Sequence, residues 1–234
     1  MKRSELKLES YSPYSGVEQG CFIEGESGLL YPGVRIENIS YPLTISSVQG
    51  AVCSCLANRD KPVRYYSEQP DPELLHWWAE QYDFEIIRKL PEKGELFSPL
   101  KAPSEIPSVS DALEELLAYA VTIHSDFPVS ALILTSEGYV GGVNVEVPSW
   151  SLGLCAERVA IARTIAHNFS DLHEISICAP KSEFSSPCGA CRQVLSEFMP
   201  DSVVELYHGD SSLSRHNVRH LLPYSIITQA LKKK

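Results

Sequence analysis

Three cysteines and one glutamate in the second half of the chain have the types and spacing of a catalytic metal site. Cys155 is followed two residues later by Glu157, and Cys188 and Cys191 form a Cys-x-x-Cys pair after Pro187. Three thiolates can hold a zinc ion and leave the fourth tetrahedral position open for water, as catalytic zinc sites do. A carboxylate beside the metal that is not needed as a ligand can carry protons to and from that water. We therefore expect one Zn²⁺ per chain, with the glutamate as general acid and base.

Two other kinds of site also use a Cys-x-x-Cys pair, namely redox centres and structural zinc knuckles. A redox pair would not need Cys155, Glu157 or Pro187. A structural zinc would need a fourth Cys or His at short spacing, and none follows the pair. The pattern therefore favours the catalytic metal.

The residues around the motif predict an α/β unit that positions it. Residues 154–167 read as a helix that carries Cys155 and Glu157 in its first turn, and residues 189–199 read as a second helix. The positive ends of both helix dipoles would favour the deprotonated thiols that bind zinc. The other elements expected here are a helix at 109–121 and strands at 129–135, 139–145, 173–179 and 203–207.

An internal repeat organises the chain. Residues 33–48 align without gaps on residues 142–157 at a constant offset of 109 residues, with a Gly, a Glu, a Ser and an aromatic residue in step. We therefore expect two tandem α/β/α units with mixed sheets flanked by helices, the first with its linker in residues 1–104 and the catalytic one in residues 105–234. The elements expected in the first copy are strands at 19–24, 29–36, 62–66 and 84–88, helices at 45–57 and 72–82, and a linker at 90–107.

Only the second copy carries the chemistry. Ser46 stands at the position of Cys155, and Val48 stands at the position of Glu157. Residues 70–74 take the place of the Cys-x-x-Cys pair and contain no thiol. The first copy cannot hold this zinc, and we expect its role to be structural.

Composition narrows the classes of partner. The net charge of −10 argues against a nucleic-acid partner, which normally requires a basic surface. No apolar run is long enough to span a membrane. Residues 1–5 already include three charged side chains, and no apolar segment of a secretory leader is expected after them. Seven cysteines, three of them in a metal pattern, suggest a reducing compartment, and we expect a cytoplasmic protein.

Four motifs occur in order in the second half of the chain: Phe127-Pro128-Val129, Asn144-Val145-Glu146, Cys155-Ala156-Glu157-Arg158 and Pro187-Cys188-Gly189-Ala190-Cys191-Arg192-Gln193. Together they resemble those of the cytidine deaminases of nucleoside salvage. The resemblance covers residues 108–226 and, more weakly, residues 11–82. An acidic residue two positions after a Cys, followed by Pro-Cys-x-x-Cys, is also the signature of zinc-dependent nucleobase deaminases.

The resemblance implies hydrolytic deamination of cytidine and deoxycytidine to the uridines, with release of ammonia, in pyrimidine salvage. It implies that Phe127 stacks on the base and that Asn144 and Glu146, two apart on one strand face, bind the ribose hydroxyls. It also implies a substrate contact at Ala156 and a donor beside the thiolates in Arg158. Without the resemblance, these residues read equally as core or surface positions.

Departures from the family pattern leave the substrate open. Val147 and Pro148 replace the usual Asn after the Glu of the Asn-x-Glu motif, and His124 replaces a Tyr before the stacking Phe. A deaminase of a modified cytosine nucleoside such as blasticidin S therefore remains an alternative. A polynucleotide cytosine deaminase is disfavoured by the acidic charge, and an idle scaffold is disfavoured by the complete second copy.

The first copy also suggests an assembly. Small single-copy members of the resembled family form tetramers whose pockets borrow side chains from neighbours. A two-copy chain could reproduce that arrangement as a homodimer, with Tyr41 or Trp150 bordering a catalytic pocket across the interface. The alternative is that Tyr14 and Tyr41 only pack the core of their own unit.

Overall fold

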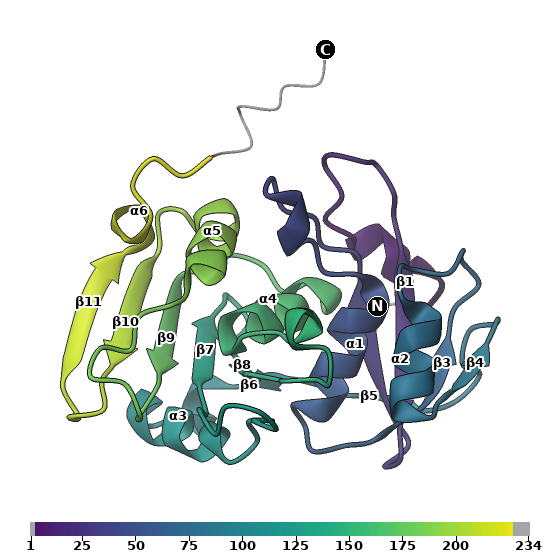
Figure 1. The fold of residues 1–234 in the computed structure, drawn as a ribbon, viewed down its shortest axis with the longest axis horizontal. Coiled ribbons are helices and arrows are strands. Elements are labelled where there is room, and N and C mark those ends of the chain that lie inside the picture. The colour runs from purple at the N-terminus through teal and green to yellow at the C-terminus, as the bar shows by residue number, and fades with distance from the viewer. Residues whose placement is uncertain (1–2, 227–234) are drawn as a thin grey trace.

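Two α/β units lie side by side in the computed structural model, which describes residues 3–226 (Figure 1). The first unit contains a five-stranded sheet, and the second contains a six-stranded sheet. Elements of the first unit are β1 (Gly20–Gly25), β2 (Leu29–Val34), β3 (Pro62–Tyr66), β4 (Glu85–Ile87), β5 (Glu95–Leu96), α1 (Ser47–Leu56), α2 (Leu75–Tyr82) and the 3₁₀ turns η1 (Arg3–Glu9) and η2 (Tyr41–Leu43).

The sheet of the second unit has one strand more than that of the first, the edge strand β11. Its elements are β6 (Leu100–Lys101), β7 (Ser130–Leu134), β8 (Tyr139–Val143), β9 (Glu174–Cys178), β10 (Val203–Tyr207), β11 (Leu213–Asn217), α3 (Val109–Leu117), α4 (Ala156–Ala166), α5 (Gly189–Phe198), α6 (Val218–Leu221), η3 (Pro103–Glu105) and η4 (Trp150–Leu152).

The duplication read from the sequence is also present in the topology. The strand order β4-β3-β1-β2 of the first sheet matches β10-β9-β7-β8 of the second. In both units the first two strands form an antiparallel hairpin, and the last two of the series run parallel. The repeated glycine has the same task in each copy. A Cβ on Gly33 would lie 2.2 Å from the carbonyl oxygen of Ser47, and one on Gly142 would lie 2.3 Å from that of Ala156. The mixed α/β fold with helix-flanked sheets is thus confirmed.

Alternating side chains place the helices of the second unit on both faces of its sheet. Ala131 and Ile133 of β7 pack in one apolar cluster with residues of α4 and α5. Leu132, between them, packs with Leu113 of α3 in another cluster. Because successive strand residues point to opposite faces, α4 and α5 cover one face and α3 covers the other.

One apolar core runs across both units. Phe22, Tyr31 and Trp78 of the first unit belong to the same buried cluster as Val145 and Val159 of the second. Figure 1 shows α1 and α4 side by side at this junction. The core of the first unit therefore extends into the second unit, which also has two buried clusters of its own residues.

The contacts across the junction follow an approximate two-fold relation. Arg158 donates to the carbonyl oxygen of Leu43 at 3.0 Å, and Gln49, its equivalent 109 residues earlier, donates to that of Leu152 at 2.9 Å. Leu43 and Leu152 are themselves equivalent residues of the two copies. Two copies of one fold thus face each other through matching surfaces, as in a symmetric dimer.

Several helices are shorter than expected because neighbouring residues pair as strands. Leu154 exchanges hydrogen bonds with Val145, so α4 begins at Ala156 and Cys155 is its N-cap residue rather than part of its first turn. Ile45 pairs with Ile36 in the same way ahead of α1. Helix α3 ends at Leu117, four residues before the expected end at residue 121.

The expected linker at 90–107 is partly ordered into the sheets. Its strand β5 pairs with β2 and its strand β6 pairs with β8, so each sheet gains an edge strand from it. Strand β11 and helix α6 were not expected from the sequence. Among residues 3–226, no helix is long and apolar enough to cross a membrane. Residues 1–2, part of the expected charged start, lie outside the described residues.

Candidate active site

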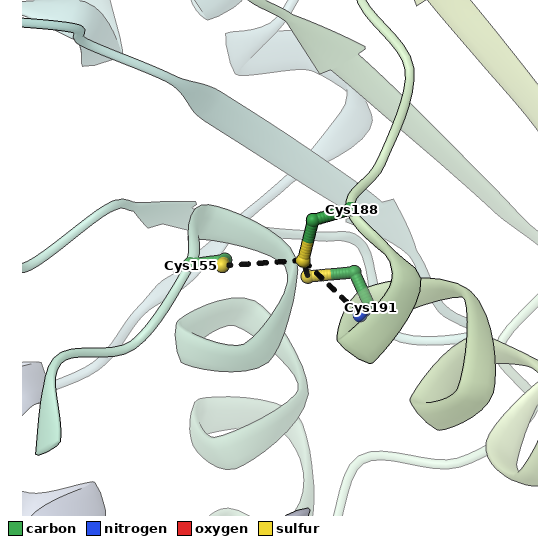
Figure 2. A group of neighbouring side chains, drawn as sticks. All are labelled: Cys155, Cys188 and Cys191. Carbon is green, nitrogen blue, oxygen red and sulfur yellow. Dashed lines mark hydrogen bonds between the residues drawn. The ribbon is translucent and has the colours of Figure 1, made fainter. Parts of the chain in front are cut away.

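Two helix N-termini bring the three predicted thiols together. Cys155 is the N-cap residue of α4, Cys188 is that of α5, and Cys191 lies in the first turn of α5. Figure 2 shows the three side chains pointing toward one another from these two helices. Their sulfur atoms all lie within 4.8 Å of one another, and they form the single cluster of this kind among the described residues.

The spacing of the sulfurs fits a zinc ion. Tetrahedral zinc with Zn–S bonds of about 2.3 Å separates its sulfur ligands by about 3.8 Å. The Sγ atom of Cys188 lies 3.8 Å from that of Cys155 and 3.5 Å from that of Cys191. Three thiols also match the preference of zinc for sulfur ligands, and no fourth cysteine or histidine of the described residues belongs to the cluster.

The three thiols change one another's pKa through the hydrogen bonds between them. Hydrogen bonds from Cys155 and then Cys191 lower the pKa of Cys188, and the main-chain N–H of Cys191 donates to its Sγ at 3.5 Å. Hydrogen bonding with Cys188 raises the pKa of Cys155, and hydrogen bonding with Cys155 and Cys188 raises the pKa of Cys191. The Cys188 thiolate therefore already has hydrogen-bond donors around it. A bound Zn²⁺ would replace the thiol protons of Cys155 and Cys191.

Glu157 lies beside the thiols in the first turn of α4. Its side chain is buried, and burial raises its pKa to about 7. The negative charge of Cys188 acts in the same direction, whereas hydrogen bonding with Cys191 opposes it. This carboxyl is thus close to the metal ligands without occupying the position of one.

A cavity of about 420 Å³ opens onto these groups. Cys155, Glu157 and Cys188 lie in its wall, and so do Phe127 and Trp150. Its volume is within the usual range for a small-molecule site. All the residues that line it belong to the second unit, between positions 125 and 188.

Asn144 holds the loop that carries the aromatic residue Phe127. Its Oδ1 accepts from the N–H of Val129 at 2.8 Å, and its Nδ2 donates to the carbonyl oxygen of Phe127 at 2.9 Å. Both Asn144 and Phe127 line the cavity, as the resemblance implies. In this structure the amide is engaged with the main chain, so it fixes the aromatic residue in place.

Glu146 also lines the cavity and has a second task that the sequence did not reveal. It accepts hydrogen bonds from the N–H groups of His124 and Ser125 and from the Ser125 hydroxyl. Burial would raise its pKa, but these bonds outweigh burial and lower the pKa below its usual value. Glu37 receives the same three bonds from Tyr14 and Ser15 in the first unit. The repeated glutamate thus closes the same turn in both copies.

Two predicted site residues lie elsewhere than expected. Ala156 is buried in the apolar core behind the site and does not line the cavity. Arg158 was expected beside the thiolates, but it reaches across the junction to Leu43, and its buried Nε has no hydrogen-bond partner among the described residues. The direction of Arg158 follows from helix geometry, because it lies one residue beyond Glu157 and so faces the other unit.

The two aromatic residues proposed for an interface occupy equivalent exposed positions. Tyr41 is 84% exposed and Trp150 is 67% exposed. Trp150 borders the cavity of its own chain, where it contacts the His124 ring edge-to-face. Tyr41 does not line this cavity.

Four serines of the cavity wall escaped the sequence analysis, because isolated serines carry no motif. They lie in two loops on either side of the opening, and an ion pair between Lys181 and Asp126 at 2.7 Å joins these loops. The pair is largely exposed and therefore contributes little to stability. The serines are Ser125, Ser182, Ser185 and Ser186.

Comparison with known proteins decides the family. The sequence model described as the cytidine and deoxycytidylate deaminase zinc-binding region matches residues 107–206. A protein of Dictyostelium discoideum named probable cytidine deaminase is 36% identical over 121 residues, which are 51% of this chain and 82% of that protein. The chain belongs to the cytidine deaminase family. Its metal cofactor is Zn²⁺, in keeping with the three-thiol cluster.

Other cytidine deaminases are similar over the same share of the chain. The cytidine deaminase of Halalkalibacterium halodurans is 36% identical over 102 residues, 43% of this chain and 77% of that protein. A crystal structure of cytidine deaminase from Burkholderia pseudomallei is 30% identical and covers 50% of this chain and 94% of its own, with a TM-score of 0.47.

Proposed function

We propose that this cytidine deaminase hydrolyses the 4-amino group of cytidine and deoxycytidine in pyrimidine salvage. One observation carries the proposal. The buried carboxyl of Glu157 and the thiols of Cys155 and Cys188 line one cavity that is large enough for a nucleoside. Water replaces the amine at C4 of the base, so cytidine and water give uridine and ammonia.

Glu157 moves the protons of this reaction. It accepts a proton from the attacking water, delivers it to N3 of the base, and then helps to protonate the amine that leaves as ammonia. Zinc, held by Cys155, Cys188 and Cys191, supplies a Lewis acid that makes water acidic near neutral pH. Burial of Glu157 keeps bulk water from competing for these protons.

The loops at the cavity orient the nucleoside. Phe127, fixed by Asn144, offers an aromatic face for the base. Glu146 keeps acceptor capacity beyond the three bonds it already receives, because a carboxylate has about four lone-pair positions. We assign it, with Asn144, to the ribose hydroxyls, and Ala156 acts only through its place behind the site.

A substrate panel tests the reaction. Ammonia release should be fastest with cytidine and deoxycytidine and at least tenfold slower with blasticidin S. A blasticidin-S deaminase of Bacillus cereus is 29% identical over 104 residues, so this antibiotic is the informative competitor. Single-stranded DNA that contains cytosine should release no ammonia, because the net charge of −10 repels phosphates. Faster turnover of blasticidin S or of DNA would contradict the assignment.

We assign the first unit, with its linker in residues 1–104, a bracing role toward the catalytic unit in residues 105–234. The linker strand β6 is the part of this segment that joins the catalytic sheet. Glu197, in the last turn of α5, accepts hydrogen bonds from the hydroxyls of Tyr11 at 3.0 Å and Tyr14 at 2.6 Å, and from the N–H of Ile39 at 2.9 Å. Helix α5 begins with the ligands Cys188 and Cys191. The turn closed by Glu37 thus supports the helix that carries two ligands.

We also infer that the active form is a cytoplasmic homodimer. All seven cysteines are free thiols, which suits a reducing compartment. Large aromatic residues that are exposed on one chain, as Tyr41 and Trp150 are, are enriched at protein interfaces.

Light scattering should therefore give about twice the 26.0 kDa mass of one chain. Tyr41→Lys combined with Trp150→Lys should shift the protein toward monomers, because the charges would be desolvated at the interface. Leu74→Lys, at a residue 52% exposed in the first unit, is the matched control and should leave the dimer intact. A fully active wild-type monomer would refute the assembly.

A further inference from the structure

A second cavity, of about 410 Å³, lies at the junction of the two units and away from the thiols. Its wall combines the end of α1, the linker and helix α3 with Arg163 of α4. The two cavities share no lining residue. Its volume is again that of a small-molecule site.

Arg163 brings a buried positive charge to this wall. The residue is 5% exposed, and the centre of its guanidinium lies 5.0 Å from the ring centroid of Phe97. It forms three hydrogen bonds, to the hydroxyl and carbonyl of Ser54 and to the carbonyl of Gly141, all of them neutral groups. No ion pair with a carboxylate occurs for Arg163 in the part of the chain that the structure describes.

The bonding of this guanidinium is incomplete. An arginine has five N–H donors, so after the three bonds two have no hydrogen-bond partner among the described residues. Burial of the charge lowers the pKa of Arg163 to about 10, which reflects the cost of a cation without a counter-charge. Buried charges are normally paired, because desolvation is otherwise uncompensated.

We propose that this cavity is a second binding site, which takes a small molecule bearing a phosphate or carboxylate group. The oxyanion would pair with Arg163 and accept its two free N–H donors. Asn58 and Ser98 supply further polar groups in the wall. The wall also contains Lys101 and Glu105, which form a loose pair at 3.9 Å, and the exposed carboxylate of Glu115. Arg163 is the one buried charge among these lining residues.

The site is connected to the catalytic centre through α4. Arg163 lies in the same helix as Glu157, and Phe97 joins it to the linker. The main-chain carbonyl of Phe97 also contacts Nε2 of His167, just beyond the end of α4, at 2.7 Å. A bound anion would thus act on the helix that begins at a zinc ligand.

Calorimetric titration of the full-length zinc protein with inorganic phosphate, uridine 5′-monophosphate and succinate tests the proposal. The three probes distinguish free phosphate, a phosphate on a nucleoside and a carboxylate. We expect at least one of them to bind with a Kd below about 1 mM. Glu157→Gln should bind it with unchanged affinity, because the catalytic cavity is separate.

Two variants locate the binding. Arg163→Gln should weaken it at least tenfold. Ala112→Phe should abolish it by filling the cavity while Arg163 and its present bonds stay in place. Glu114→Phe is the control, because it adds the same ring to an exposed position of α3 outside the cavity. No binding of any probe to the wild type, or equal binding by Ala112→Phe, would overturn the proposal.

Discussion

Replacing Glu157 by Gln is expected to lower kcat by about 10²- to 10⁴-fold, the usual contribution of a general acid and base. The amide has nearly the same shape as the carboxyl but cannot accept the proton of the attacking water. Glu157 is buried at the cavity wall and Gln has nearly its size, so the change tests proton transfer rather than packing.

The variant should still hold one zinc ion per chain. Its three thiols lie within 4.8 Å of one another and are positioned by the N-termini of two helices, and Glu157 is not among these ligands. The measurement therefore combines steady-state rates of ammonia release with metal analysis of the same sample.

Glu183→Gln is the matched control. Glu183 is exposed in the loop before the Cys188 ligand and does not line the cavity. This variant should keep the wild-type rate. The proton-transfer role is wrong if Glu157→Gln retains more than about a tenth of wild-type kcat, a loss too small for a general base. Two zinc ions per chain in either protein would contradict the single site.

Removal of residues 1–104 is expected to abolish activity because the catalytic unit loses part of its core. Val145 and Val159 of the second unit are buried in a cluster with Phe22, Tyr31 and Trp78 of the first. Each large apolar side chain exposed by the truncation costs on the order of 1.5–3 kcal/mol. Whole domains are stable by only about 5–15 kcal/mol, so several such losses suffice to unfold the fragment.

Polar contacts would be lost as well. Arg163 would lose both of its bonds to Ser54, and Glu197 would lose the tyrosine hydroxyls and the N–H that it binds. A buried or half-buried charge without its partners destabilises the fold further. Residues 105–234 alone should therefore give an aggregated or molten protein by circular dichroism and gel filtration.

Coexpression separates packing from covalent connection. Fragments 1–104 and 105–234 produced together should associate and recover activity, since the junction is built from side-chain contacts on both sides. If fragment 105–234 alone were a folded, fully active monomer, the bracing role of the first unit would be refuted. Failure of the pair to associate would instead assign the requirement to the covalent connection between the units.

The sequence alone determined the metal centre and the duplication. Cys155, Cys188 and Cys191 were predicted as ligands because zinc chemistry restricts both residue type and spacing. The repeat at an offset of 109 residues predicted two similar sheets, since a repeated pattern of glycine and apolar residues specifies a repeated fold. The strands at 62–66 and 203–207 were predicted with the bounds that the structure gives.

Helix ends and helix faces needed the tertiary structure. Leu154 is of a residue type that favours helices, but its pairing with Val145 keeps it extended and makes Cys155 the N-cap residue of α4. Such pairing is a long-range contact that local propensity does not encode. The bond of Arg158 to Leu43 could not be predicted for a similar reason, because only the position of the first unit shows that Leu43 lies within its reach.

The second role of Glu146 and the environment of Arg163 were also decided in three dimensions. Nothing near Glu146 in sequence indicates that a turn more than twenty residues earlier will donate three hydrogen bonds to it. Arg163 reads as an ordinary helix arginine, yet packing of α4 against α1 buries it beside Ser54. Residue types restrict which metals and reactions are possible, whereas burial and partners arise from contacts between segments far apart in the chain, and these set the charge state and orientation of each group.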